Sequence, residues 1–120
     1  MALNTDVGTA DSESYVSVAD YKAWADGNGT SYAGKTDTQI EQAARRATTF
    51  IDGAYGRKFI GQRTNGRSQA LCWPRIDAWD AENEEYIASD EIPDEVVTAT
   101  CEAIARELTT AGSLAPDMKR

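Results

Sequence analysis

The chain has 120 residues, of which 41% are hydrophobic and 27% charged, and its formal net charge is −8. These values predict one soluble domain with a modest core, and the negative charge argues against a general nucleic-acid binder. No apolar run reaches the roughly 18 residues that a membrane span requires. Residues 1–6 lack the basic and apolar parts of a secretion signal. We therefore expect a protein that stays in the cytoplasm where it is made and has no membrane partner.

The residue types present argue against most catalytic sites. The chain contains no histidine, which removes the usual general base and the commonest metal ligand. The two cysteines, Cys72 and Cys101, do not have the spacing of a metal site, and we expect both to be reduced core residues. The glycines are scattered and form no phosphate-binding loop. We expect neither an enzyme nor a bound cofactor or metal ion.

Two adjacent segments carry opposite charge. Residues 45–75 hold seven basic side chains and one acid, whereas residues 76–95 hold nine acids and no base. These blocks form either an ordinary solvated surface or a contact between the basic part of one subunit and the acidic part of the next. A head-to-tail contact of that kind can close into a ring. The candidate interface residues are Arg57, Lys58, Arg63, Arg67, Trp79, Asp80, Glu82, Glu84, Glu85 and Tyr86.

The start of the chain is predicted to contain an arm and a first helix. Residues 1–14 are polar and rich in Thr, Asp, Ser and Gly, so we expect a flexible arm that gains order only in an assembly. Ser17 is a suitable N-cap, and Asp20 follows it three residues later. The helix should run from Val18 to about Asp26 and end at Gly27-Asn28-Gly29.

The second helix is the clearest element of the sequence. Thr36 and Gln39 have the spacing of a capping box, and the helix should end near Gly53 and Gly56. Its apolar stripe follows the helical period and has small residues in its first half, so that another helix can approach closely. The stripe consists of Ile40, Ala43, Ala44, Ala47, Phe50, Ile51 and Ala54.

The segment between the second and last helices is predicted to be irregular. Residues 57–67 form a basic loop, in which 58–60 is extended and Asn65-Gly66 makes a tight turn. Trp73 precedes Pro74, which favours an extended conformation for the tryptophan, and we expect its large side chain in the core, packed against the second and last helices. Trp79 and Tyr86 flank six mostly acidic residues, and this segment should form a short hairpin.

The last helix is predicted from Pro93 to about Ala111. Pro93 is placed as its first residue, acids fill its first turn, and Gly112 should end it. Its buried stripe consists of Val97, Thr100, Cys101, Ile104 and Leu108. Residues 113–120 should form a short flexible tail.

Together these elements predict a mainly α fold. We expect a small three- to four-helix bundle with a short β-hairpin or extended arm, flexible termini and one helical domain over residues 15–112. The expected core contains Trp24, Phe50, Ile51, Trp73, Val97 and Ile104. Four aromatic residues near loops either pack under their own loops or face a partner. These are Tyr32, Tyr55, Trp79 and Tyr86.

Five segments in order resemble the small head–tail connector proteins (adaptor, or head-completion) of tailed bacteriophages. The segments span residues 15–111, and the alanine-rich helix and the ALCWPR run contribute most to the resemblance. They read YVSVADY (15–21), AARRATTFID (43–52), RKFIG (57–61), QALCWPR (69–75) and IPDEV (92–96).

The resemblance implies a structural virion protein without catalytic activity. Such proteins form a ring, typically of twelve copies, below the portal protein at the neck of the capsid vertex. The ring joins the portal to tail-completion or stopper proteins and helps to retain packaged DNA, which it contacts or merely surrounds. Assembly of the ring would take place in the host cytoplasm.

Two other functions remain open from sequence. Related sequences are often labelled DnaT-like single-stranded-DNA-binding proteins, so a DNA-binding accessory protein is the alternative, and an unrelated enzyme or regulator is a third. Binding of single-stranded DNA that weakens with salt would favour the DNA-binding accessory protein, because phosphate contacts release counterions.

Overall fold

A computed structural model describes residues 3–110 of the chain. In this part, three α-helices are accompanied by two small antiparallel sheets, which confirms the mainly α fold. The elements in chain order are α1 (Val18–Gly27), α2 (Asp37–Tyr55), the 3-10 turn η1 (Gly56–Lys58), β1 (Gln62–Arg63), the 3-10 turn η2 (Gly66–Ser68), β2 (Arg75–Ile76), β3 (Trp79–Asp80), β4 (Glu85–Tyr86) and α3 (Asp94–Thr109).

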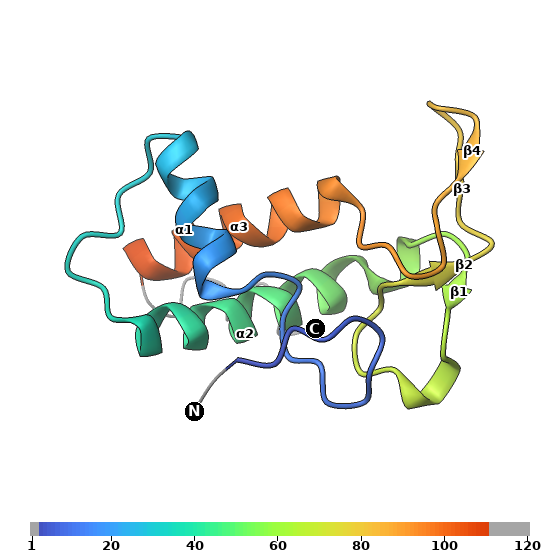
Figure 1. Cartoon of the computed structure of the whole chain (residues 1–120), viewed down its shortest axis with the longest axis horizontal. Coiled ribbons are helices and arrows are strands. Elements are labelled where there is room, and N and C mark those ends of the chain that lie inside the picture. The colour runs from blue at the N-terminus through green and yellow to red at the C-terminus, as the bar shows by residue number, and fades with distance from the viewer. Residues whose placement is uncertain (1–2, 111–120) are drawn as a thin grey trace.

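The helices occupy one end of the molecule and the sheets the other. Figure 1 shows α2 and α3 side by side and running in opposite directions, with α1 across the end where α2 begins. The β3–β4 hairpin projects from the opposite end, above the β1–β2 pair. The sequence predicted the β3–β4 hairpin, whereas the β1–β2 pair is an addition to the predicted fold.

The first two helices begin where their capping residues predict. Ser17 Oγ accepts a hydrogen bond from the Asp20 N–H at 3.0 Å at the start of α1. At the start of α2, Thr36 Oγ1 accepts from the Gln39 N–H at 3.1 Å, and Gln39 Oε1 accepts from the Thr36 N–H at 2.8 Å. Both reciprocal bonds of the capping box are therefore present. The last residue of α1 is Gly27, one position after the predicted Asp26, and Asn28 of the predicted stop caps the helix.

The α2 stripe is buried only in part. Ile40, Ala43, Ala44, Ala47 and Ile51 lie in the core, and the three small alanines let α3 approach closely, as predicted. Phe50 is half-buried and Ala54 is exposed, so the core ends earlier along α2 than the sequence pattern indicated.

The last helix differs from its prediction at both ends. Pro93 is the N-cap residue and Asp94 the first helical residue, so α3 begins one position later than expected. It ends at Thr109 rather than Ala111, and the predicted stop at Gly112 and the tail at 113–120 lie outside the described residues. Glu107 is buried on this helix and accepts a hydrogen bond from Arg46 Nη1 at 2.7 Å. Glu107 lies beside the predicted apolar stripe, and burial of an acid there was not expected.

The N-terminal segment lies against the body from residue 3 onward, which differs from the free arm expected for residues 1–14. Asn65 Nδ2 donates to Gly8 O at 2.8 Å, and the Ala70 N–H donates to Thr9 O at 3.1 Å. Residues 1 and 2 lie outside the described part. The mobility of this segment in the free monomer stays a prediction, which amide exchange can test.

Two hydrophobic clusters form the core of the described part of the chain. The helical cluster joins the three helices around Tyr21, Ile40 and Ile104. The hairpin-end cluster consists of Tyr15, Cys72, Trp73, Ala78 and Val96. Trp24, Phe50 and Val97, which we expected in the core, are only half-buried and pack against the helical cluster. Both cysteines are free and buried, as predicted.

Trp73 is 4% exposed, which confirms it as a core residue. It contacts α3 through Val96 within the hairpin-end cluster, whereas its connection to α2 is polar. The backbone N–H of Trp73 donates to Tyr15 Oη at 3.1 Å, and Tyr15 Oη donates to Asp52 Oδ1 at 2.6 Å. Asp52 Oδ2 also accepts from the Cys72 N–H at 3.1 Å. Asp52, on α2, therefore holds the ALCWPR segment in place.

Burial raises the pKa of Asp52, and the hydrogen bonds from Tyr15 and Cys72 only partly oppose this effect. The folded protein therefore binds this proton more readily than the unfolded chain, and Asp52 adds stability as the pH falls through its raised folded pKa. We expect the free energy of unfolding of the wild type, relative to Asp52→Asn, to increase between pH 7 and pH ~4. Urea unfolding at several pH values measures this difference.

Asp80→Asn is the control for this pH series. Hydrogen bonds from Asn83 lower the pKa of Asp80, so its contribution is lost, rather than gained, as the pH falls. The difference in free energy of unfolding between wild type and Asp52→Asn should therefore change with pH in the opposite direction to that for Asp80→Asn. A difference that does not change with pH, or that changes in the same direction as for Asp80→Asn, would contradict the raised pKa of Asp52.

Candidate interaction site: an acidic hairpin and an apolar groove

The β3–β4 hairpin presents two exposed aromatic residues. Trp79 and Tyr86 face each other across the two strands, with ring centroids 5.0 Å apart in a T-shaped arrangement. Trp79 is 45% exposed and Tyr86 67% exposed. Large aromatic side chains in such a position are enriched at protein interfaces. Of the other loop aromatics, Tyr55 is also exposed, whereas Tyr32 packs edge-on against Tyr21.

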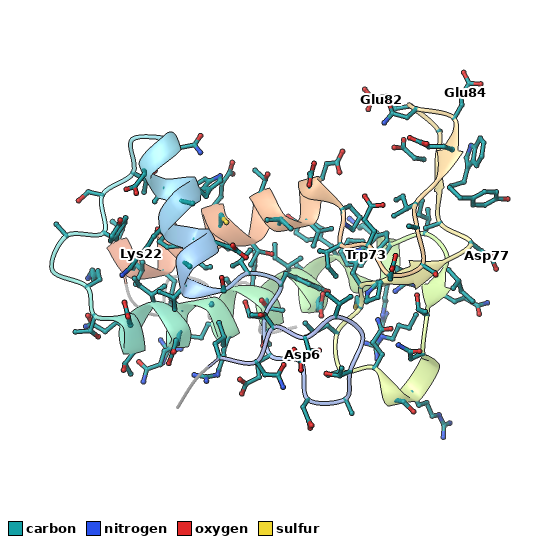
Figure 2. The ribbon with its side chains drawn as sticks, in the orientation of Figure 1. Asp6, Lys22, Trp73, Asp77, Glu82 and Glu84 are labelled. Atoms are coloured by element: carbon teal, nitrogen blue, oxygen red, sulfur yellow. The ribbon has the colours of Figure 1, made fainter. Side chains whose placement is uncertain are left out.

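Asp80 organises the tip of the hairpin. Its Oδ1 accepts from the backbone N–H groups of Glu82 and Asn83, at 3.1 and 3.2 Å, and its Oδ2 accepts from Asn83 Nδ2 at 2.8 Å. Glu84 adopts a left-handed backbone conformation with φ of 55°, which closes the turn. Figure 2 shows Glu82 and Glu84 pointing away from the body. With Glu85, the hairpin carries four carboxylates and no basic residue.

The base of the hairpin is fixed to the body. The Ile87 N–H donates to Ala78 O at 2.8 Å, and Ala78 is fully buried. Thr64 Oγ1 donates to Ser89 O at 2.6 Å, which connects the chain after the hairpin to the end of β1. The aromatic pair is therefore presented by an anchored element rather than by a free loop.

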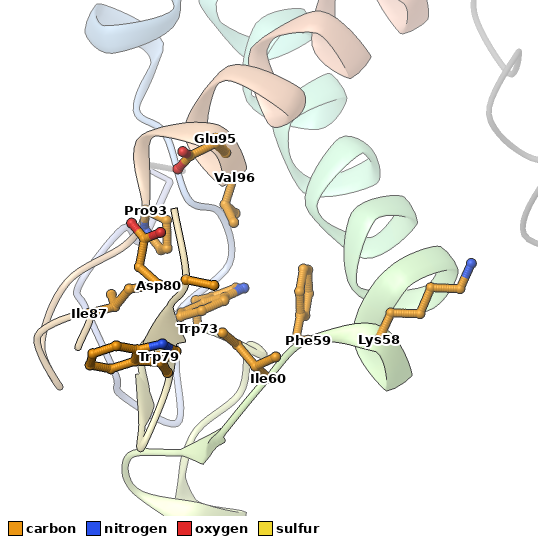
Figure 3. Close-up of a pocket in the computed structure, with 11 residues that line it drawn as sticks. Lys58, Phe59, Ile60, Trp73, Trp79, Asp80, Ile87, Pro93, Glu95 and Val96 are labelled. Atoms are coloured by element: carbon orange, nitrogen blue, oxygen red, sulfur yellow. The ribbon is translucent and has the colours of Figure 1, made fainter. Parts of the chain in front are cut away.

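An apolar groove of about 380 Å³ lies beside the hairpin. It is bounded by the hairpin, the residues after η1 and the start of α3, and Trp73 lies at its centre (Figure 3). Charged groups are confined to its rim, where Asp80 and Glu95 lie on one side and Lys58 extends outward on the other. The lining residues are Lys58, Phe59, Ile60, Trp73, Trp79, Asp80, Ala81, Ile87, Pro93, Glu95 and Val96.

The indole N–H of Trp73 has no hydrogen-bond acceptor among residues 3–110. Phe59 packs edge-on against the Trp73 ring, with centroids 5.5 Å apart. Buried polar groups are nearly always paired in folded proteins. An unpaired donor beside a groove therefore indicates a position where a bound group could supply the acceptor.

The structure separates the ten predicted interface residues into groups. The hairpin residues Trp79, Asp80, Glu82, Glu84, Glu85 and Tyr86 lie together. Lys58 joins them at the groove, whereas Arg63 is half-buried and donates to Gln69 O at 3.2 Å. Arg57 and Arg67 are exposed on η1 and η2. The expected contact between these bases and the acids of a neighbouring copy stays a prediction.

Sequence reasoning missed the groove itself. Its apolar lining comes from four separate segments, and only the tertiary fold brings Phe59, Ile87 and Val96 to one place. An indication was present in the sequence, because Ile60 and Ile87 are apolar residues inside charged loops. Ile60 is indeed 48% exposed.

Residues 3–110 contain neither a candidate metal site nor a membrane-spanning helix. No cluster of three or more cysteine, aspartate or glutamate side chains there could hold a metal ion. No helix in the same range combines the length and apolar character needed to cross a membrane.

The fold and site define a small, mainly α protein with a protruding aromatic hairpin beside an apolar groove. Over residues 1–120 the chain matches the model of the family described as "Putative DnaT-like ssDNA binding protein", and it belongs to that family. Comparison with curated proteins gave no match, and neither did comparison with solved structures.

Proposed function

We propose that this protein is a structural assembly subunit of the head–tail connector type, and that its hairpin makes the contacts between subunits. The observation that carries the proposal is the exposed Trp79–Tyr86 pair, held on an anchored hairpin next to an apolar groove. An aromatic anchor beside an apolar surface with a charged rim is the usual composition of a protein–protein contact.

The charge distribution supports a protein partner over a nucleic acid. The hairpin that displays the aromatic rings carries four carboxylates, which repel phosphate. Much of the basic block also serves the fold: Arg45 pairs with Glu13, Arg46 with Glu107, and Arg75 is buried. Within residues 3–110, the side chains of Arg57, Lys58 and Arg67 make no hydrogen bond or ion pair, and these suit the acidic hairpin of a neighbouring copy.

The proposed assembly is a homo-oligomeric ring, with twelve copies as the resemblance to phage connectors implies. Its partners would be the portal protein on one side and a tail-completion or stopper protein on the other, in the neck of the virion. The proposal assigns the chain no catalytic step and no cofactor. The resemblance of the five segments supports this finer role.

We expect the double variant Trp79→Ala/Tyr86→Ala to remain folded and to lose at least about tenfold in self-association, because hot-spot aromatics each contribute upward of about 1–2 kcal/mol. Sedimentation velocity over a concentration series measures the association. Tyr55→Ala is the matched control, since it removes an exposed aromatic residue from α2. Equal association of all three proteins would contradict the proposal.

Binding of single-stranded DNA is the second candidate function. The family description favours it, and so do the exposed rings of Trp79 and Tyr86, on which bases can stack. In this case a decathymidine oligonucleotide should bind more weakly at 200 mM than at 50 mM salt, and Lys58→Gln should reduce the slope. Measurable binding of this kind, without self-association, would replace the connector proposal.

A further inference from the structure

The groove beside the hairpin has the features of a peptide-docking site. Trp73 is only 4% exposed. Its indole N–H has no acceptor among residues 3–110 and lies at the groove. In Figure 3 this nitrogen faces the space between Phe59 and Val96. A ligand that supplies a carbonyl oxygen here would satisfy the donor, and its apolar side chains would fill the remaining volume.

The rim specifies the charge of the ligand. The carboxylates of Asp80 and Glu95 lie at the groove, whereas the Lys58 amino group points away from its centre (Figure 3). A phosphate would be repelled by the two acids, while a lysine or arginine next to the apolar part of a ligand would be attracted. The geometry therefore favours an extended peptide with apolar and basic residues over a nucleic-acid strand.

We propose that the groove binds residues 111–120 of a neighbouring copy, an inference that rests on the proposed self-assembly. This segment, which lies outside the described residues, reads Ala-Gly-Ser-Leu-Ala-Pro-Asp-Met-Lys-Arg. In an extended peptide, Leu114, Pro116 and Met118 fall on one face, because side chains alternate along a strand. Arg120 falls on the same face and matches the acids at the rim, whereas Asp117 and Lys119 fall on the opposite face.

The length of the chain places the donor on another copy. The groove lies at the start of α3, and the sixteen residues of Asp94–Thr109 span about 24 Å at 1.5 Å per residue. From Thr110 to Leu114 an extended chain covers at most about 14 Å, so Leu114 cannot reach the groove of its own molecule. All three apolar side chains enter together only from a neighbour.

Docking also requires a small rearrangement within the groove. The Trp73 nitrogen is covered at present, and the half-buried Phe59 ring lies edge-on beside it. Rotation of the Phe59 side chain opens the N–H to a backbone carbonyl of the incoming segment. The contact then combines one hydrogen bond, three apolar side chains and the Arg120 charge at the rim.

The test uses the indole N–H signals of the full chain, labelled with ¹⁵N. The three tryptophans are Trp24, Trp73 and Trp79, and Trp73→Phe assigns the relevant signal. The receptor is the variant Leu114→Asp/Met118→Asp, whose own segment should no longer compete. We expect an unlabelled peptide of residues 111–120 to shift the Trp73 and Trp79 signals in a saturable manner and to leave Trp24, in α1, unchanged.

Matched variants locate the contact. Trp73→Phe keeps an aromatic ring and removes the donor, so the affinity should fall about 3- to 10-fold. Glu95→Gln should also weaken binding, whereas Glu102→Gln, which changes another exposed acid two turns later on α3, should not. A peptide carrying aspartate at positions 114 and 118 should produce no shift. Circular dichroism confirms that each variant is folded.

The possible outcomes separate this inference from the proposed function. If the peptide leaves Trp73 unchanged, or if decathymidine shifts it instead, the peptide site is wrong. If the wild type self-associates and Leu114→Asp/Met118→Asp does so to the same extent, the subunit proposal stands and the docking inference fails. If the peptide binds while the wild type stays monomeric at all concentrations, the groove assignment stands and the assembly proposal fails.

Discussion

Replacement of Trp73 with alanine is expected to lower the free energy of unfolding by about 3–5 kcal/mol. The side chain is 4% exposed, contacts Phe59 edge-on and belongs to the hairpin-end cluster. Its removal leaves a cavity between α3 and the groove that the anchored strands cannot close. Because small domains are stable by only about 5–15 kcal/mol, the variant should be largely unfolded at moderate temperature. Urea unfolding followed by circular dichroism measures the loss.

Trp79→Ala is the matched control for this prediction. It removes the same side chain from a position that is 45% exposed, where its main contact is the edge-on pair with Tyr86. The expected loss is about 0.5–1.5 kcal/mol, the usual value of an aromatic pair. Similar losses for both variants would show that Trp73 contributes no more to the fold than an exposed aromatic residue.

Arg75→Met is expected to cost about 3–5 kcal/mol, since each unsatisfied buried acceptor costs about 1–3 kcal/mol. The Arg75 guanidinium donates to three backbone carbonyls: Nε to Ile60 O at 2.7 Å, Nη1 to Cys72 O at 3.0 Å and Nη2 to Gly61 O at 2.9 Å. Methionine fills a similar volume but donates nothing, so the three acceptors lose their partner together.

Two other substitutions make the arginine prediction specific. Arg75→Lys keeps the charge but cannot reproduce the planar geometry of three donors, so its loss should be intermediate. Arg67→Met removes an exposed arginine from η2 and should change the stability by less than about 0.5 kcal/mol. A full rescue by Arg75→Lys would show that charge, and not the three hydrogen bonds, is what matters at this position.

The sequence predicts helices well where capping and periodicity agree. Thr36 with Gln39, and Ser17 with Asp20, set the helix starts correctly, because their hydrogen bonds are local. The β1–β2 pair depends instead on residues that are distant in sequence. Gly61 has φ of +75°, and a Cβ there would lie 2.2 Å from Ile76 O, so a glycine is needed for this close approach. A loop glycine alone does not reveal its partner strand.

The candidate site was predictable only in part. The acidic hairpin follows from local pattern, since Trp79 and Tyr86 flank a turn-forming acidic segment. The groove and the role of Arg75 follow from tertiary contacts between several segments, which no local rule gives. The charge count for residues 45–75 also overstated the number of basic side chains available to a partner. It counted Arg45, Arg46 and Arg75 as charges available to a partner, although Arg45 and Arg46 form ion pairs within the chain and Arg75 is buried.

The division of the core into two clusters has a consequence for how the protein opens. The helical cluster contains most of the buried aliphatic contacts, whereas the hairpin-end cluster has five buried residues and is connected to α2 by the Tyr15–Asp52 hydrogen bond. Proteins open in cooperative units, and the unit with less buried apolar surface opens at lower free energy. The hairpin end can therefore separate transiently while the three helices stay packed. Amide exchange would then be faster throughout the interaction surface than in the helices that support it.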